Sequence, residues 1–136
     1  TYTLEGRYAA NLDGYRLTNN NPVKTPMDYG IFMALSSDIL PIDPLVGLYA
    51  AVTRKGMSGE IYGLDEAITI EEAIRGYTAN GAWITFEEDI KGTLEPGMLA
   101  DMVVLSENLL TINPEDIMDV EIDMTIVGGN VLYERN

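Results

Sequence analysis

The feature that most constrains the fold is a run of five apolar residues, Ile31–Leu35, which lies between Gly30 and a polar Ser-Ser-Asp stretch. The run does not alternate polar and apolar residues. It is therefore typical of a strand buried on both faces, as in a parallel sheet covered by helices. This predicts an α/β fold, in which functional sites lie beyond the carboxyl ends of the strands. Asp38, just after the run, is the first candidate functional residue, although a carboxylate there can also close a turn.

A helix is predicted directly after this stretch. Asp43 is a typical N-cap and Pro44 a typical first helical residue. Apolar residues then recur at the spacing of one helix face: Leu45, Leu48, Tyr49 and Val52. Arg54 and Lys55 suit the negative end of the helix dipole, and Gly56 suits the C′ position that follows a helix. We expect the helix to end near Arg54-Lys55-Gly56, with Asp43 serving as its cap.

Further helices are predicted between residues 69 and 92. Thr69–Glu72 matches a capping box, in which the first side chain and the fourth each bond the other's amide. The pair Asn80-Gly81 is expected to break or bend this helix, and a further helical segment should end by Gly92. Trp83 and Phe86 are expected to lie in the core, because large aromatic side chains bury much apolar surface.

After Gly92 the sequence changes to a pattern of strands and turns. Met102–Leu105, Ile122–Val127 and Asn130–Tyr133 read as strands. Gly128-Gly129 joins the last two and indicates a β-hairpin. Asp101 is expected to brace a turn by accepting hydrogen bonds from backbone amides.

Composition excludes several functions. The chain has 136 residues, of which 46% are hydrophobic, so it is one small domain or part of a larger one. The net charge of −14 argues against nucleic acid and anionic membranes as partners. Histidine and cysteine are absent, which removes the commonest metal ligands, the commonest general base and the thiol nucleophile. With no apolar run near 18 residues and no leader, the sequence favours a cytoplasmic location.

The whole negative charge falls in residues 60–136, which carry three basic and 17 acidic side chains. Residues 1–59 carry five of each. A strongly solvated C-terminal half is the first interpretation of this imbalance, and a cation-binding acidic surface is the second.

Several separated motifs together indicate a family. They are Ser-Ser-Asp-Ile-Leu-Pro-Ile-Asp-Pro-Leu at 36–45, Gly-Leu-Tyr-Ala-Ala-Val-Thr-Arg at 47–54, Thr-Ile-Glu-Glu-Ala at 69–73, Tyr-Thr-Ala-Asn-Gly-Ala at 77–82, Lys-Gly-Thr-Leu-Glu-Pro-Gly at 91–97, Ala-Asp-Met-Val-Val-Leu at 100–105 and Thr-Ile-Val-Gly-Gly at 125–129. With these motifs, residues 22–133 resemble the C-terminal part of the amidohydrolase superfamily, specifically the amidohydrolase-3 branch of metal-dependent hydrolases.

The resemblance implies a (β/α)₈ barrel with one or two divalent metals, zinc being the expected ion, at its carboxyl-end face. Ile31–Leu35 resembles the eighth strand. Asp38 matches the strand-eight carboxylate, which holds metal and accepts a proton from the attacking water. The usual family motif there is Gly-Ser-Asp, and this chain has Ser at position 36 instead of Gly. The substrate class implied is a small molecule with a C–N bond of the amide type, not a peptide.

The resemblance also divides the chain. Residues 1–91 would comprise the last strand–helix unit of the barrel with its connecting helices. Residues 92–136 would be strands of a composite β-sandwich, whose partner strands come from before the barrel. Strands without those partners would favour a homodimer of this fragment.

The missing histidines limit what these residues can do alone. A catalytic zinc usually takes three protein ligands, and Asp38 is the one ligand that the resemblance assigns here. We therefore expect the fragment to hold no metal and to be inactive by itself. The alternative is a non-catalytic scaffold, or a self-associating or regulatory domain, derived from an amidohydrolase.

Overall fold

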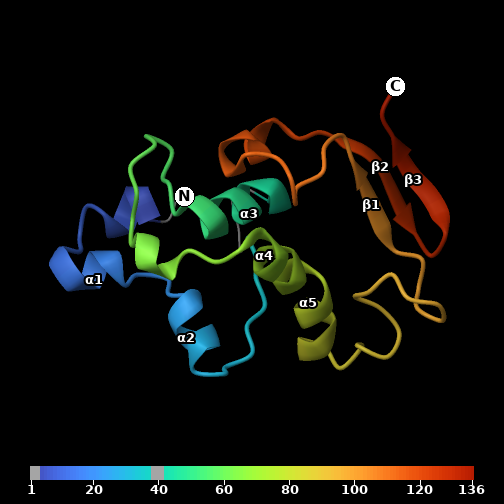
Figure 1. Cartoon of the computed structure of the whole chain (residues 1–136), viewed down its shortest axis with the longest axis horizontal. Helices are drawn as coiled ribbons and strands as arrows, with labels where there is room; N and C mark the ends of the chain where they lie inside the picture. The colour runs from blue at the N-terminus through green and yellow to red at the C-terminus, as the bar shows by residue number, and fades with distance from the viewer. Residues whose placement is uncertain (1–3, 38–41) are drawn as a thin grey trace.

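The computed structural model describes residues 4–37 and 42–136 (Figure 1). Helices occupy the first part of the chain and a small sheet the last. In chain order the elements are η1 (Leu4–Tyr8), α1 (Gly14–Thr18), α2 (Lys24–Asp28), α3 (Pro44–Thr53), η2 (Leu64–Glu66), α4 (Ile70–Tyr77), α5 (Ala79–Ile84), β1 (Met102–Leu105), η3 (Pro114–Asp119), β2 (Ile122–Val127) and β3 (Asn130–Glu134). None of the helices in the described ranges is long and apolar enough to cross a bilayer.

The start of α3 is as predicted, and its end at Thr53 lies next to the predicted Arg54-Lys55-Gly56 stretch. The Asp43 carboxylate accepts a hydrogen bond from the amide of Leu45 at 2.9 Å, and Pro44 is the first helical residue. The expected C-terminal position of Gly56 is wrong, because Arg54 adopts the left-handed conformation with φ of 57°. Its guanidinium donates to the backbone carbonyls of Tyr62, Asn21 and Asn20, and these bonds offset the cost of a non-glycine residue there.

The capping box of α4 is confirmed. The hydroxyl of Thr69 accepts from the amide of Glu72 at 3.2 Å, and the Glu72 carboxylate accepts from the amide of Thr69 at 2.8 Å. The break between α4 and α5 falls at Thr78, with φ of −121° and ψ of −93°, and not at Asn80-Gly81. Asn80 lies inside α5, where its side chain is buried and hydrogen-bonded.

The expectation that Trp83 and Phe86 belong to the core is wrong for this structure. Trp83 is 47% exposed and Phe86 is 90% exposed. The helix that carries Trp83 ends at Ile84, and Phe86 follows in a left-handed turn with φ of 59°. The ring of Trp83 contacts Phe32, with centroids 4.3 Å apart.

The strand predicted at Ile31–Leu35 is also absent from the described structure. Residues 31–37 are not assigned to any helix or strand, and they pair with no strand within residues 4–37 and 42–136. Ile31 is 57% exposed and Phe32 is 48% exposed. A parallel strand requires a neighbouring strand. Here the amide of Leu35 and the carbonyl of Met33 form their hydrogen bonds with α4 and α5 instead.

The three strands predicted after Gly92 are confirmed. They form one antiparallel sheet in the order β1-β2-β3. Gly128 and Gly129 have φ of 55° and 79°, as a two-residue type I′ hairpin turn requires. The Asp101 carboxylate accepts from the amide of Gly128 at 2.6 Å, which confirms its bracing role.

The hydrophobic core joins the helices to residues of the C-terminal part. In Figure 1, η3 lies beside α3, on the opposite side from α4. The buried apolar cluster consists of Leu48, Ala51, Ile68, Ala73, Leu109, Ile117 and Val120. The segment that links the sheet strands therefore packs on the helices, although the sheet itself stays largely exposed on both faces.

Candidate functional site

Asp38, the predicted metal ligand and general base, lies outside the described residues. The structure does describe the chain on either side of it. The first flanking segment, residues 31–37, is named here the leading stem. The second, residues 42–47, contains the start of α3 and is named the trailing stem. The site is built from these two stems.

The leading stem lies along α4 and α5 and is fixed to them at three positions. The amide of Leu35 donates to the carbonyl oxygen of Gly76 at 3.0 Å. The carbonyl oxygen of Met33 accepts from the side-chain amide of Asn80 at 2.6 Å. The rings of Phe32 and Trp83 are in contact, as noted above. As the stem advances, its contacts move backwards along the helices, so the two run antiparallel.

Gly76 is required by the close approach of the stem. A Cβ atom placed on Gly76 would lie 2.8 Å from Cγ of Leu35, which is shorter than side-chain carbons tolerate. The glycine therefore allows the stem to reach the helix backbone directly.

The trailing stem is held by the same helix. Asp43 caps α3, and the first turn of α3 brings Gly47 against the hydroxyl of Tyr77. A side chain at Gly47 would overlap that hydroxyl. Burial raises the pKa of Tyr77, and the negative charge of Asp43 raises it further. The phenol therefore stays protonated at neutral pH and acts as a neutral packing group.

One short stretch, residues 76–80, thus contacts both stems; we name it the 76–80 bracket. Gly76 and Asn80 bind the leading stem, and Tyr77 contacts the trailing stem. The sequence predicted the cap at Asp43, but it did not predict the bracket. The motif at 77–82 was the available indication, because it accompanies the Asp38 motif in the same family resemblance.

The residues of this chain do not by themselves fit a catalytic metal centre. Within residues 4–37 and 42–136 no three acidic side chains come together as metal ligands, and the whole chain has neither histidine nor cysteine. One carboxylate, that of Asp38, is too few for a zinc site that needs three protein ligands.

Two charged side chains, Arg54 and Glu66, are buried in the interior, and the sequence did not predict this. The Glu66 carboxylate accepts from the amides of Val23 and Thr25 at 2.9 Å each, and from the Thr25 hydroxyl. Burial raises the pKa of Glu66. The hydrogen bonds from Thr25 and Val23 and the charge of Arg54 outweigh that effect, so the pKa lies below its usual value. Each group is hydrogen-bonded, so its role is structural: Glu66 of η2 holds the start of α2, and Arg54 holds the carbonyls of Asn20, Asn21 and Tyr62.

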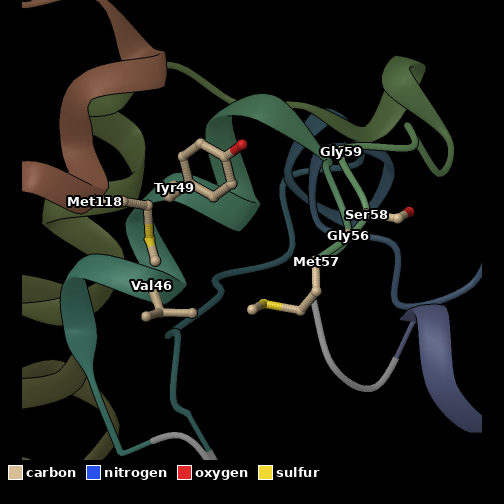
Figure 2. Close-up of a pocket in the computed structure, with 7 residues that line it drawn as sticks. All are labelled: Val46, Tyr49, Gly56, Met57, Ser58, Gly59 and Met118. Atoms are coloured by element: carbon tan, nitrogen blue, oxygen red, sulfur yellow. The ribbon is translucent and has the colours of Figure 1, made fainter.

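A pocket of about 330 Å³ lies between α3, the loop at residues 56–59 and η3 (Figure 2). Figure 2 shows Met118 and Met57 on opposite sides of this hollow, with Val46 of α3 beside it. Its lining residues are Val46, Tyr49, Gly56, Met57, Ser58, Gly59 and Met118. None of them is charged, so the pocket offers apolar contact without an acid or base for catalysis.

Comparison with known proteins gives the family. A sequence profile described as the amidohydrolase family matches residues 6–133, a longer stretch than the motifs cover. The chain is 36% identical over 118 residues to YtcJ of Bacillus subtilis, an alignment that covers 83% of this chain and 22% of YtcJ. It is 31% identical over 116 residues to an N-substituted formamide deformylase of Arthrobacter pascens, covering 84% of this chain and 21% of that protein.

An imidazolonepropionase of Kosmotoga olearia is 32% identical over 115 residues, covering 81% of this chain and 26% of that enzyme. The fold resembles the crystal structure of an amidohydrolase from Thermotoga maritima, with a TM-score of 0.59 and 22% identity over 80% of this chain and 24% of that one. The chain thus spans about a fifth to a quarter of the length of these relatives. The profile match extends over nearly all of its residues, and the chain therefore belongs to the amidohydrolase family.

Proposed function

We propose that this chain is the C-terminal part of a metal-dependent hydrolase that cleaves C–N bonds in small, non-peptide, amide-type molecules. The profile match over residues 6–133 carries the proposal. The names of two relatives, an N-substituted formamide deformylase and an imidazolonepropionase, support the bond type. The exact substrate would depend on pocket residues supplied by the rest of the parent protein.

The architecture proposed for the parent assigns two roles to this chain. Residues 1–91 would provide the last strand–helix unit of a (β/α)₈ barrel. The leading stem is not a strand in the described structure, and it would become the eighth strand only by pairing with strands from outside this chain. Residues 92–136 would provide part of a composite β-sandwich. Two observations support this: the leading stem is exposed at Ile31 and Phe32, and the three-stranded sheet exposes apolar residues on both faces. Both surfaces require cover from outside the described residues.

Asp38 is the catalytic residue that we propose for this segment. In the parent it would contribute one carboxylate to a divalent-metal site, with zinc as the expected ion and the other ligands coming from outside this chain. Its free oxygen would accept a proton from the water that attacks the carbonyl carbon. Because this chain alone cannot complete the metal site, we expect the 136-residue chain by itself to hydrolyse nothing.

The test compares two proteins: the 136-residue chain and the product of the complete open reading frame that encodes it. Both are assayed, with zinc added, on a panel of open-chain formamides and cyclic amides. We expect hydrolysis by the complete product, loss of hydrolysis in its Asp38→Asn variant, and none by the 136-residue chain. An open reading frame that encodes no histidines, or an active 136-residue chain, would contradict the proposal.

A second candidate is a self-associating scaffold that is not an enzyme. It is favoured by the sheet, because the outer edges of β1 and β3 pair with no strand within the described residues. An unpaired edge can accept a strand from a second copy. Light scattering over a range of concentrations tests this candidate: the mass should rise toward that of a dimer, and a concentration-independent monomer would contradict it.

A further inference from the structure

We propose that residues 13–28 form a strap that opens and closes as one unit on the helical body of α3, α4 and α5, and that Arg54 and Glu66 are the two charges that hold it closed. The strap contains α1 and α2 and lies at the opposite end of the molecule from the sheet (Figure 1). Two observations carry this inference: its backbone is hydrogen-bonded to both buried charges, and none of its own residues is buried. The inference concerns a conformational change and does not depend on the proposed hydrolysis.

The strap buries little apolar surface against the rest of the chain. Neither α1 nor α2 contains a buried residue, and Tyr15 of α1 is 80% exposed. Val23 and Met27 pack on the core, and both are only partly buried. Segments with few buried apolar contacts open at a lower free energy than the core of the same protein. We therefore expect the strap to open while the core stays folded.

The loop between α1 and α2 is held by a cation. Arg54 is 3% exposed, and its guanidinium donates to the carbonyl oxygens of Asn20 at 2.9 Å and Asn21 at 3.2 Å. A third bond, to the carbonyl oxygen of Tyr62, fixes the guanidinium outside the strap. A buried charge costs free energy unless it is hydrogen-bonded or paired. The carbonyls of the strap supply part of that compensation only while the strap is closed.

The start of α2 is held by an anion. Glu66 is also 3% exposed, and its carboxylate accepts from the amides of Val23 and Thr25 at 2.9 Å each and from the Thr25 hydroxyl. These amides lie at the N-terminal end of α2, where backbone N–H groups have no partner within the helix. The strap thus presents carbonyls to the cation and amides to the anion within six residues, 20–25. Because both sets of bonds belong to one short stretch of backbone, we expect them to break together.

Acid weakens the anionic anchor. Burial raises the pKa of Glu66, but the hydrogen bonds from Thr25 and Val23 and the charge of Arg54 outweigh it, so the pKa is lowered while the strap is closed. The stabilisation that Glu66 gives to the closed strap is present above its open-state pKa and is lost as the pH falls through the lowered value. The other charged groups around this anchor are Lys24 and its ion-pair partner Asp28 on α2, Asp65 beside Glu66 in η2, and Glu72 of α4.

The first experiment measures native-state amide hydrogen exchange in the 136-residue chain at neutral pH. In the wild type, residues 13–28 should be less protected than α4. Glu66→Gln removes the anionic charge and Arg54→Met removes the guanidinium. Each should speed exchange in the strap by about 10- to 100-fold, because hydrogen bonds to charged groups are stronger than neutral ones. The matched control Glu95→Gln makes the same change on an exposed side chain and should leave the strap as in the wild type.

Three results of this experiment would overturn the inference. The first is equal protection of the strap and α4 in the wild type. The second is unchanged exchange of the strap in either the Glu66→Gln or the Arg54→Met variant. The third is acceleration of α4 by the same factor as the strap, since that would mean destabilisation of the whole chain and not release of one segment.

The second experiment needs no substitution, so it also decides the case in which a variant does not fold. Exchange in the wild type is followed as the pH is lowered below the ordinary carboxyl pKa, and each rate is divided into the intrinsic rate at the same pH. The protection of residues 13–28 should fall at a higher pH than that of α4. Loss of protection in both segments at the same pH would contradict a latch that opens separately from the core.

Discussion

At the scale of the residue, Gly47 shows how closely the trailing stem fits its support. An added Cβ there would overlap the Tyr77 hydroxyl and lie 2.7 Å from the ring carbon that bears it, so the half-buried ring would have to move. We expect Gly47→Ala to lower the free energy of unfolding by about 1–3 kcal/mol, measured by denaturant titration. Gly81→Ala is the matched control, since nothing lies within 4 Å of its Cβ position and alanine favours the helix. A Gly47→Ala variant as stable as the wild type would show that the contact is loose.

Glu66 gives a prediction for acid stability, also at the scale of the residue. Its carboxyl pKa is lowered in the folded chain, so the native state favours the ionised form more than the unfolded chain does. The stabilisation is present above the unfolded-state pKa and is lost as the pH falls through the lowered, folded-state value. In thermal melts at pH values below the usual carboxyl pKa, the wild type should lose stability as the pH falls. The loss should be smaller in the Glu66→Gln variant. The exposed control Glu95→Gln should keep the wild-type pH dependence; equal curves for all three proteins would refute the assignment.

At the scale of the element, α4 depends on its capping box. Thr69→Ala removes the hydroxyl that accepts from the amide of Glu72, and the expected cost is about 1 kcal/mol in the free energy of unfolding. Glu72→Gln serves as the control because an amide can still accept from the amide of Thr69. Both variants are compared by urea denaturation. A Thr69→Ala variant as stable as Glu72→Gln would contradict the role of the Thr69 hydroxyl at the start of α4.

The elements also show what the sequence could predict. Local rules of hydrogen bonding and conformation located the Asp43 cap, the α4 capping box and the Gly128-Gly129 hairpin, because each depends on residues close in sequence. The prediction of a strand at Ile31–Leu35 was wrong for this structure. A strand forms only when a neighbouring strand pairs with it, and the apolar composition of a segment does not show whether such a neighbour is present. The C′ role predicted for Gly56 was wrong, because three carbonyls remote in sequence or separated by a loop stabilise Arg54 in the left-handed region that closes α3. The 76–80 bracket could not be predicted, since it arises only when α4 packs beside α3. The division at residue 91 and the role of Asp38 stay predictions.

At the scale of the whole molecule, the net charge of −14 should make stability depend on salt. Mutual repulsion of the acidic groups in residues 60–136 opposes the compact state, and ions screen it over about 10 Å at 0.1 M salt. Raising NaCl from low to moderate concentration should increase the free energy of unfolding by on the order of 1 kcal/mol, which raises the melting temperature by a few degrees. KCl should act equally, because screening does not distinguish the two cations. A melting temperature that falls with salt would mean that the surface ion pairs outweigh the repulsion.

The core described above has a consequence for proteolysis. Leu109, Ile117 and Val120 pack with Leu48 and Ala73, although the largely exposed chain of residues 86–99 lies between the two groups. A protease that cuts within that exposed stretch breaks a covalent connection but leaves the buried contacts in place. The two resulting peptides should therefore migrate as one particle in a native column and separate only in denaturant. In such a nicked protein, the sheet would remain attached to the helices by the buried core and the ion pair between Lys55 and Glu115, with no covalent link.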